Sequence, residues 1–193
     1  MKEGKNMKLL TINVHSWLEN NQLEKLDILA KTIVEKKYDV IAMQEVNQLI
    51  NSENVYSNIK KDNFGKMLLD KINSYGESQD IHSISSRKIL KVTLEINNQT
   101  IEFYSCHMNL PTCEDENIRE NLYNLVNHTD DSNLKIFMGD FNTDAIGSSE
   151  DYKNIISQGL FDTYTLAEKK DSGITVDKSI DGWANDKSQK RID

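Results

Sequence analysis

Cysteine, proline and long apolar runs are all scarce in this sequence. Its 193 residues include two cysteines, Cys106 and Cys113, which are too few for a disulfide scaffold. The single proline, Pro111, provides no linker, and no apolar run approaches the roughly 18 residues of a membrane span. The polar residues 1–8 do not resemble a secretory signal. We therefore expect one cytoplasmic domain over residues 1–193, with Cys106 as a buried and inert thiol.

Positive charge is also in short supply. The sequence has 23 Lys and Arg against 31 Asp and Glu, a net charge of −8. Clustered Lys and Arg supply most of the non-specific affinity of proteins for nucleic acid, through counterion release. The acidic balance therefore disfavours nucleic acid as the partner, although a nuclease with a local basic groove stays open. A small phosphorylated substrate, whose charge is met by a bound cation, fits the balance better.

Helix and strand patterns alternate along most of the chain and predict an α/β fold. Short apolar runs predict buried strands at 8–14, 39–43 and 134–138. Apolar residues at helical spacing predict helices at 22–36, 63–72, near 118–126 and near 149–157. Leu90 to Ile96 alternates apolar and polar residues, turns at Asn97-Asn98 and returns from Thr100 to His107 as a partner strand. After Asn142 the pattern weakens.

Polar residues follow four of the predicted strands directly. They are Asn13, Gln44-Glu45, His107 and the run Gly139-Asp140-Phe141-Asn142. Polar groups at several strand ends can converge on one edge of a sheet, where a rigid scaffold can assemble a site. Taken singly, each has an ordinary explanation as a strand-end cap, a solvated charge, a satisfied histidine or a turn. The combination is more specific than any member.

These residue types suit hydrolysis of a phosphate ester with a hard cation. Mg²⁺ takes a few oxygen ligands, keeps several waters and binds substrate phosphate. Glu45 offers a charged ligand and Asn13 a neutral oxygen. Asp140 can accept a proton from an attacking water, while Asn142 and His107 can donate hydrogen bonds to phosphoryl oxygens. A zinc site is not indicated, because the sequence has no Cys pair at metal spacing and no His-x-x-x-His.

A family resemblance rests on five elements in their order along the chain. Thr-Ile-Asn13, Met-Gln44-Glu45, Ser-Cys-His107, Gly139-Asp140-Phe141-Asn142 and Arg191-Ile192-Asp193 resemble the endonuclease/exonuclease/phosphatase superfamily. The resemblance covers nearly the whole chain and implies a four-layer α/β-sandwich, with two mixed sheets between helices. It implies Mg²⁺, or alternatively Mn²⁺, bound by Asn13 and Glu45. It also implies that His107 contacts the scissile phosphate and that Asp140 and Asn142 activate water and orient the phosphoryl group.

The flanking stretches are similar to bacterial sugar-phosphate phosphatases of the maltose 6'-phosphate phosphatase kind. These stretches are residues 13–24, 59–65 and 180–183. The similarity implies a sugar phosphate as the substrate, with Trp183 at its rim and Arg191 as a second substrate-binding residue.

Two elements of the family pattern have no counterpart in this sequence. The pattern ends in Ser-Asp-His, whose histidine is oriented by the aspartate that matches Asp193. It also carries extra strands between the helix ending near Ile72 and the strand at Arg87-Lys88, where this sequence has a short segment near 73–86. We therefore expect an incomplete sandwich, less active than a form extended through Ser-Asp-His.

Three functions stay open at this point. The first is a Mg²⁺-dependent phosphomonoesterase acting on a sugar phosphate. The second is a nuclease or other phosphodiesterase, and the third is a non-catalytic remnant of the fold. No membrane partner is expected.

Overall fold

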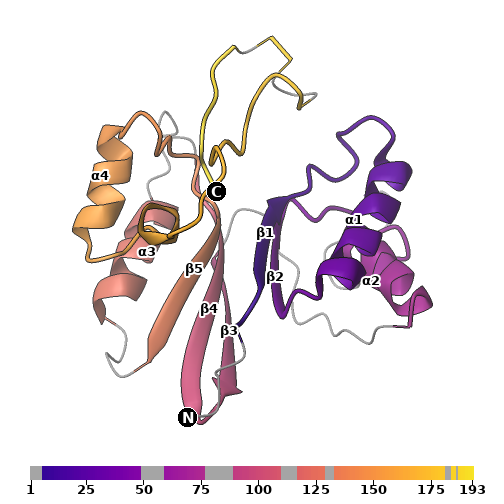
Figure 1. Ribbon diagram of the computed structural model, residues 1–193, viewed down its shortest axis with the longest axis horizontal. Coiled ribbons are helices and arrows are strands. Elements are labelled where there is room, and N and C mark those ends of the chain that lie inside the picture. Colours follow the sequence, from indigo (N-terminus) through magenta and orange to yellow (C-terminus); the bar gives the residue numbers. More distant parts are fainter. Residues whose placement is uncertain are drawn as a thin grey trace. The chain divides into compact units, whose positions relative to one another are not determined.

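The computed structural model describes residues 6–48, 59–76, 89–109, 117–128, 133–180, 184–185 and 187–193. Helices and strands alternate along the chain, as the pattern predicted, and they fall into two compact units (Figure 1). Unit 1 comprises residues 1–86 and unit 2 comprises residues 87–193. Each unit contains one sheet and its own helices, so the predicted α/β class with two sheets is confirmed.

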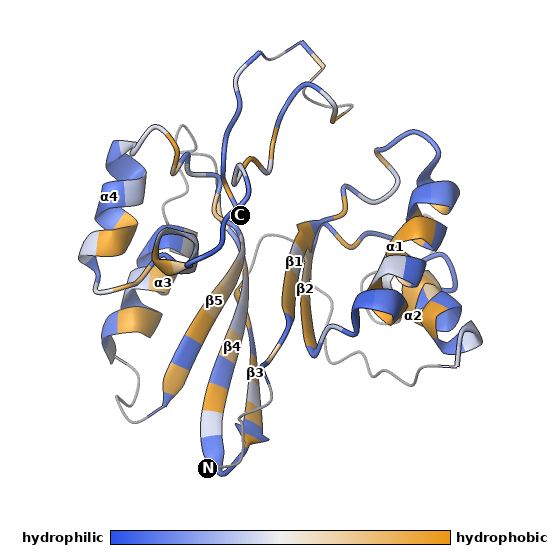
Figure 2. Ribbon diagram, viewed as in Figure 1, coloured by the Kyte–Doolittle hydropathy of each residue, from blue (hydrophilic) through white to orange (hydrophobic). Residues whose placement is uncertain are grey.

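Unit 1 is built on a parallel pair of strands. Strand β1 (Leu9–Asn13) pairs with β2 (Val40–Gln44), and Asn13 lies opposite Gln44. Helices α1 (Gln22–Lys36) and α2 (Phe64–Ser74) carry apolar stripes that meet in the core, as Figure 2 shows by their two-coloured ribbons. The buried core side chains are Val14, Leu26, Ala30, Ile33, Phe64, Leu68 and Ile72.

Strand β1 differs from its prediction in one respect. Its apolar run predicted a strand buried on both faces, but all five of its side chains are half-buried. The reason is the small size of the sheet, because among the described residues β1 pairs with β2 alone.

Unit 2 is built on a mixed sheet in the order β3-β4-β5. Strand β3 (Ile89–Ile96) is antiparallel to β4 (Gln99–His107), which is parallel to β5 (Leu134–Asp140). The hairpin turns at Asn97 and Asn98 with φ of 53° and 64°, the left-handed pair that a type I′ turn requires. The parallel register sets His107 opposite Asp140, so both lie at the same end of the sheet.

The helices of unit 2 are α3 (Asn117–His128), α4 (Glu150–Ser157) and α5 (Thr163–Leu166). Leu122 of α3 packs against Tyr104, Cys106 and Met108 in a buried cluster. Cys106 is fully buried, as predicted, and burial raises the pKa of its thiol to about 12. The thiol therefore stays protonated and unreactive at neutral pH.

Gly139 allows β4 and β5 to approach at the end that carries the candidate site. Its φ is 145°, and a Cβ at this position would lie 1.9 Å from the carbonyl oxygen of Cys106. Only glycine fits here, since any side chain would collide with backbone. The close approach of the two strands thus explains why the Gly-Asp-Phe-Asn run begins with glycine.

The weak pattern after Asn142 concealed two features of unit 2. One is the short helix α5, which Asp162 caps by accepting from the N–H groups of Tyr164 and Thr165. The other is the return of residues 190–193 to the sheet end, where the N–H of Phe141 donates to the carbonyl of Ile192 at 2.8 Å.

Within the described ranges, no helix has the length and apolar character needed to cross a membrane. Two predicted features lie outside the described residues: Trp183 as a substrate contact, and the start of a strand at Arg87-Lys88.

Candidate functional site

In unit 1 the two predicted cation ligands lie together at the carboxyl ends of the strands. Asn13 is the last residue of β1, and Glu45 directly follows β2. The Asn13 Nδ2 donates to the Glu45 Oε1 at 3.1 Å. The Asn13 Oδ1 accepts from the N–H of His15 at 3.1 Å. The parallel pairing of β1 and β2 therefore places a carboxylate beside an amide.

The backbone of Glu45 is held in an unusual conformation. Its φ is 54°, in the left-handed region, which costs a residue with a side chain about 1–2 kcal/mol. The buried Ser16 stabilises this turn, because its N–H (3.3 Å) and its hydroxyl both donate to the carbonyl of Glu45. The Ser16 Oγ also accepts from the N–H of Asn47 at 2.6 Å. One serine thus joins the loops after β1 and β2.

Trp17 fixes the same loop to α2. Its indole Nε1 donates to the carbonyl of Asn47 at 3.2 Å, and that carbonyl also accepts from the N–H of Phe64 at 3.0 Å. The Trp17 and Phe64 rings pack edge to face with centroids 6.2 Å apart. Trp17 has a φ of 66°, so this packing holds a bulky residue in a conformation it rarely adopts.

In unit 2 the structure brings His107, Asp140 and Asn142 together. His107 and Asp140 are each 5% exposed, and the His107 Nε2 lies 3.9 Å from the Asp140 Oδ2. The other carboxylate oxygen of Asp140 accepts from the N–H of Asn142 at 2.8 Å. Asn142 is left-handed, with φ of 49°, and its Nδ2 donates to the carbonyl of Met108 at 2.8 Å.

This arrangement can perform part of a phosphoester hydrolysis. A carboxylate beside an imidazole can accept a proton from water, and the imidazole can donate a hydrogen bond. The Asn142 amide carries two N–H donors, of which one goes to Met108 and the other can meet a phosphoryl oxygen. Burial strengthens each of these interactions, because water competes less.

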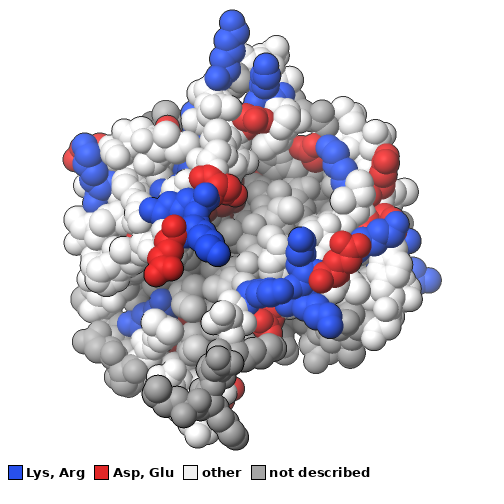
Figure 3. All heavy atoms as spheres, viewed as in Figure 1, with Lys and Arg blue, Asp and Glu red and all other residues white. Residues whose placement is uncertain are grey.

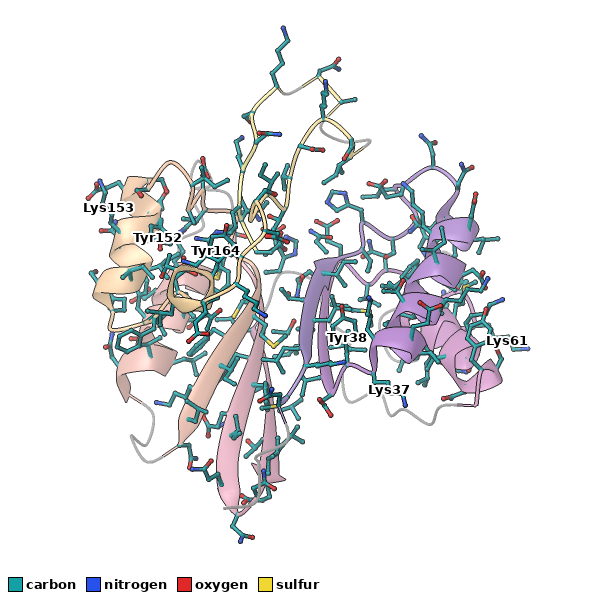
Figure 4. All side chains as sticks on the ribbon, viewed as in Figure 1. Lys37, Tyr38, Lys61, Tyr152, Lys153 and Tyr164 are labelled. Atoms are coloured by element: carbon teal, nitrogen blue, oxygen red, sulfur yellow. The ribbon has the colours of Figure 1, made fainter. Side chains whose placement is uncertain are left out.

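Arg191 lies in a half-buried ion pair of unit 2. Its Nη1 and Nη2 donate to the two carboxylate oxygens of Asp162 at 3.2 and 2.6 Å. Its guanidinium stacks 4.6 Å from the Tyr164 ring, and the Tyr152 hydroxyl donates to Asp162 at 2.8 Å. Tyr152 and Tyr164 are labelled in Figure 4. These contacts give Arg191 a structural role, and its predicted contact with substrate stays a prediction.

The hydrogen bonds of this ion pair shift the pKa values of the groups that make them. Burial raises the pKa of the Asp162 carboxyl, but hydrogen bonds from Arg191 and Tyr152 outweigh burial and leave that pKa below its ordinary value. Burial, together with the hydrogen bond to Asp162, raises the pKa of Tyr152. Asp162 is therefore charged, and Tyr152 neutral, throughout the neutral range.

The donor set in unit 1 suits a hard cation. Among the described residues, no three or more His, Cys, Asp or Glu side chains gather as a metal cluster would. Asn13 and Glu45 offer one amide oxygen and one carboxylate instead. Mg²⁺ fits so sparse a set because it retains waters and completes its shell with substrate oxygens. Tetrahedral zinc, which needs three or four nitrogen or sulfur ligands, does not fit it.

One comparison with solved structures decides the family. An endonuclease/exonuclease/phosphatase family protein from Leptotrichia buccalis C-1013-b is 49% identical to this chain, with a TM-score of 0.82. The match covers 97% of this chain and 86% of that one. The chain belongs to the endonuclease/exonuclease/phosphatase family. No protein-family model and no curated protein matches it. The family is one of phosphoester hydrolases, so the resemblance seen at the strand ends is confirmed at this level.

In this family member, some residues that shape the site escaped the sequence analysis. Arg119 of α3 donates to the carbonyl of Asn109 at 3.1 Å and to the Thr143 Oγ1 at 3.4 Å, joining the loops that follow β4 and β5. Its position in a charged helix gave no signal of this role. Ser16 could have been suspected, because it lies in the 13–24 stretch that carried the closer resemblance.

Proposed function

We propose that this family member hydrolyses a phosphate monoester with a bound Mg²⁺ or Mn²⁺, and that its substrate is a sugar phosphate such as maltose 6'-phosphate. The observation that carries the proposal is the setting of Asp140. Its carboxylate is buried, faces His107 at 3.9 Å and accepts from the N–H of Asn142 at 2.8 Å. A turn needs no such imidazole, whereas a group that accepts a proton from water benefits from one.

The residues at the strand ends would divide this chemistry by the roles that the family pattern gives them. Asn13 and Glu45 of unit 1 would hold the cation, which, when bound, offsets phosphoryl charge and makes water more acidic. In unit 2, His107 and Asn142 donate hydrogen bonds to phosphoryl oxygens, and Asp140 accepts the proton of the attacking water. In the family pattern, the aspartate that matches Asp193 orients the histidine of the Ser-Asp-His element, which has no counterpart in this sequence.

The charge distribution supports a small substrate over nucleic acid. On the face drawn in Figure 3, basic side chains stand beside acidic ones in both units. Described lysines pair with carboxylates, as Lys25 does with Glu19, Lys66 with Asp70 and Lys91 with Glu102. A lysine that is already paired with a carboxylate neutralises a phosphate less, so it displaces fewer of the counterions condensed on a polyanion. The sugar-phosphate assignment rests on residues 13–24, 59–65 and 180–183, and Trp183 is proposed as the rim of the sugar site.

The first test removes the charge of the proposed cation ligand. Glu45→Gln should weaken Mg²⁺ binding at least about tenfold, measured by calorimetry, because one of two protein ligands loses its charge. Glu24→Gln, a change at an exposed carboxylate of α1, is the matched control and should bind Mg²⁺ like the wild type. Equal affinities for the two variants would overturn the assignment of Glu45.

The second test distinguishes a role of Asp140 as proton acceptor from a role in forming the turn. Asp140→Asn keeps an oxygen for the N–H of Asn142 but removes the proton acceptor, so turnover should fall by about 10²–10⁴-fold with the melting temperature nearly unchanged. Asp144→Asn is the control, since Asp144 also accepts backbone N–H groups, from Ile146 and Gly147. Loss of folded protein in Asp140→Asn would support a turn role alone.

The substrate class is tested by offering wild-type protein with Mg²⁺ a panel of sugar phosphates, a phosphodiester and plasmid DNA. Phosphate release from the sugar phosphates supports the proposal. Cleavage of only the diester or DNA would make the protein a phosphodiesterase or nuclease. Mg²⁺ binding without turnover of any substrate would support a non-catalytic role.

A further inference from the structure

His15 lies between two carboxylates beside the proposed cation ligands. Its ring Nδ1 is 3.2 Å from the Glu19 Oε1, and its Nε2 is 3.8 Å from the Glu45 Oε1. The first distance is within hydrogen-bond range, and the second places the ring beside the Glu45 carboxylate without a direct hydrogen bond. The N–H of the same residue donates to the Asn13 Oδ1. His15 therefore contacts both proposed ligands, one through its backbone and the other through its ring.

Glu19 is itself held in place, so it can fix the ring. Its Oε2 pairs with the Lys25 Nζ at 2.6 Å, which leaves the Oε1 to face His15. The Gln22 Oε1 accepts from the N–H groups of Glu19 at 3.2 Å and Trp17 at 3.0 Å. The Glu19 side chain is only 11% exposed. The loop between β1 and α1 thus presents a pre-set carboxylate to the imidazole.

The backbone of His15 adds a second reason to expect a role. Its φ is 41°, the third left-handed conformation, with Trp17 and Glu45, around this cation site. Non-glycine residues in this region are uncommon and cluster at functional sites. The conformation turns the N–H toward Asn13 while the ring reaches Glu45.

We propose that His15 is a positioning residue of the cation site, and that Glu19 acts through it. The ring lies beside the Glu45 carboxylate and limits the orientations open to it, so that the carboxylate stays where the Asn13 Nδ2 also contacts it. The inference rests on the proposed function, because it requires Asn13 and Glu45 to bind the cation. Removing such an outer partner of a metal ligand typically lowers metal affinity about 10–100-fold.

The experiment titrates Mg²⁺ alone into the full chain by calorimetry, with no substrate. His15→Asn is the main variant, because asparagine tolerates the left-handed backbone but cannot span the two carboxylates. Glu19→Gln is the second variant, and the pair is combined in a double mutant. The expected result is about a 10–100-fold loss of affinity for His15→Asn and a smaller loss for Glu19→Gln. The double mutant should lose no more than His15→Asn, since Glu19 acts through the histidine.

A control variant and the electron spin resonance spectrum of bound Mn²⁺ distinguish a positioning role of His15 from a role in stability alone. Glu24→Gln should bind Mg²⁺ like the wild type. A changed Mn²⁺ spectrum in His15→Asn supports the proposal. A residue that only stabilises the loop would leave the geometry of the cation ligands unchanged. Wild-type affinity in His15→Asn, together with loss in Glu45→Gln, would overturn the inference and leave the proposed function standing. Absence of Mg²⁺ binding by the wild type would overturn both.

Discussion

The two units place their polar groups by different means. In unit 1, Glu45 lies on a loop after β2, half-buried, and hydrogen bonds from the side chain and backbone of Ser16 hold it in a left-handed turn. In unit 2, His107 and Asp140 are the last residues of paired strands, buried and set opposite each other by the register. Strand register is shared with the whole sheet, whereas a loop turn depends on a few side chains. Substitutions that disturb the strand register of unit 2 should therefore affect folding more than substitutions in the loops of unit 1.

The largest effect is expected at Gly139. Gly139→Ala would force a Cβ to within 1.9 Å of the Cys106 carbonyl oxygen, so β4 and β5 must separate. We expect a loss of about 4 kcal/mol or more in the free energy of unfolding, measured by chemical denaturation.

Gly159→Ala is the matched control for Gly139→Ala. It also has a positive φ, 92°, but nothing lies within 4 Å of the added Cβ. Its free energy of unfolding should fall by about 1 kcal/mol, from backbone strain alone. Similar losses in both variants would show that the close approach of the strands is not what makes unit 2 sensitive.

The next largest effect is expected at the Asp162–Arg191 ion pair of unit 2. Arg191→Met would leave the Asp162 carboxylate, whose side chain is 10% exposed, without its guanidinium, at a cost of about 3 kcal/mol in the free energy of unfolding at neutral pH. Lys153→Met, which removes an exposed ion pair with Glu150, should change stability by less than about 0.5 kcal/mol.

The pH dependence of Arg191→Met has a definite sign. Because the folded-state pKa of Asp162 lies below its ordinary value of 3.8, the pair stabilises the fold above about that pH. The stabilisation is lost as the pH falls through the lowered pKa. The stability gap between wild type and Arg191→Met should therefore narrow in acid. Thermal melts from pH 7 down to pH 3 check this, and a constant gap would contradict the ion-pair account.

A smaller effect is expected at the loop junction of unit 1. Ser16→Ala removes the hydroxyl that donates to the Glu45 carbonyl and accepts from the N–H of Asn47. We expect a loss of about 2 kcal/mol in the free energy of unfolding, because the N–H of Asn47 then lacks its acceptor, together with weaker Mg²⁺ binding. Ser157→Ala, at an exposed helix position, should change neither quantity. A loss of stability without any change in Mg²⁺ affinity would separate the loop junction from the cation site.

The smallest effect is expected at the cross-strand pair of unit 2. Hydrogen bonds from the Lys91 Nζ and the Tyr104 hydroxyl, each at 2.5 Å, lower the pKa of Glu102 to about 2. This pair stabilises the fold above the ordinary value of 4.5, and the stabilisation is lost as the pH falls toward 2. Since Lys91 is 43% exposed, we expect only about 1 kcal/mol. The melting temperatures of Glu102→Gln and wild type should converge between pH 5 and pH 2. A constant difference between them would show that the Lys91–Glu102 pair does not stabilise the fold.

Local patterns made much of the fold predictable. Apolar residues at helical spacing predicted the helix at 22–36, and the structure has α1 at Gln22–Lys36. Alternation and the Asn97-Asn98 turn predicted the β3–β4 hairpin. Both features depend on residues close together in sequence. The polar strand ends also predicted the family, because each element lies next to a strand that the apolar pattern reveals.

Long-range contacts were not predictable in the same way. The Asp162–Arg191 pair joins residues 29 apart, and Ser16 joins loops about 30 residues apart. A single charged or hydroxyl residue in a loop has no periodic neighbours to mark its role, so neither contact leaves a pattern in the sequence. The same holds for the contact of His15 with Glu45, which joins the loop after β1 to the end of β2.

The sequence by itself therefore determined the elements, the α/β class, the family and the residues at the strand ends, because hydrophobic periodicity and strand-end position are local properties. Tertiary structure alone decided that Asn13 meets Glu45, that Asp140 faces His107, and that Arg191 turns to Asp162. These pairings depend on strand register and on chain closure, which bring together side chains that nothing in their own neighbourhood connects.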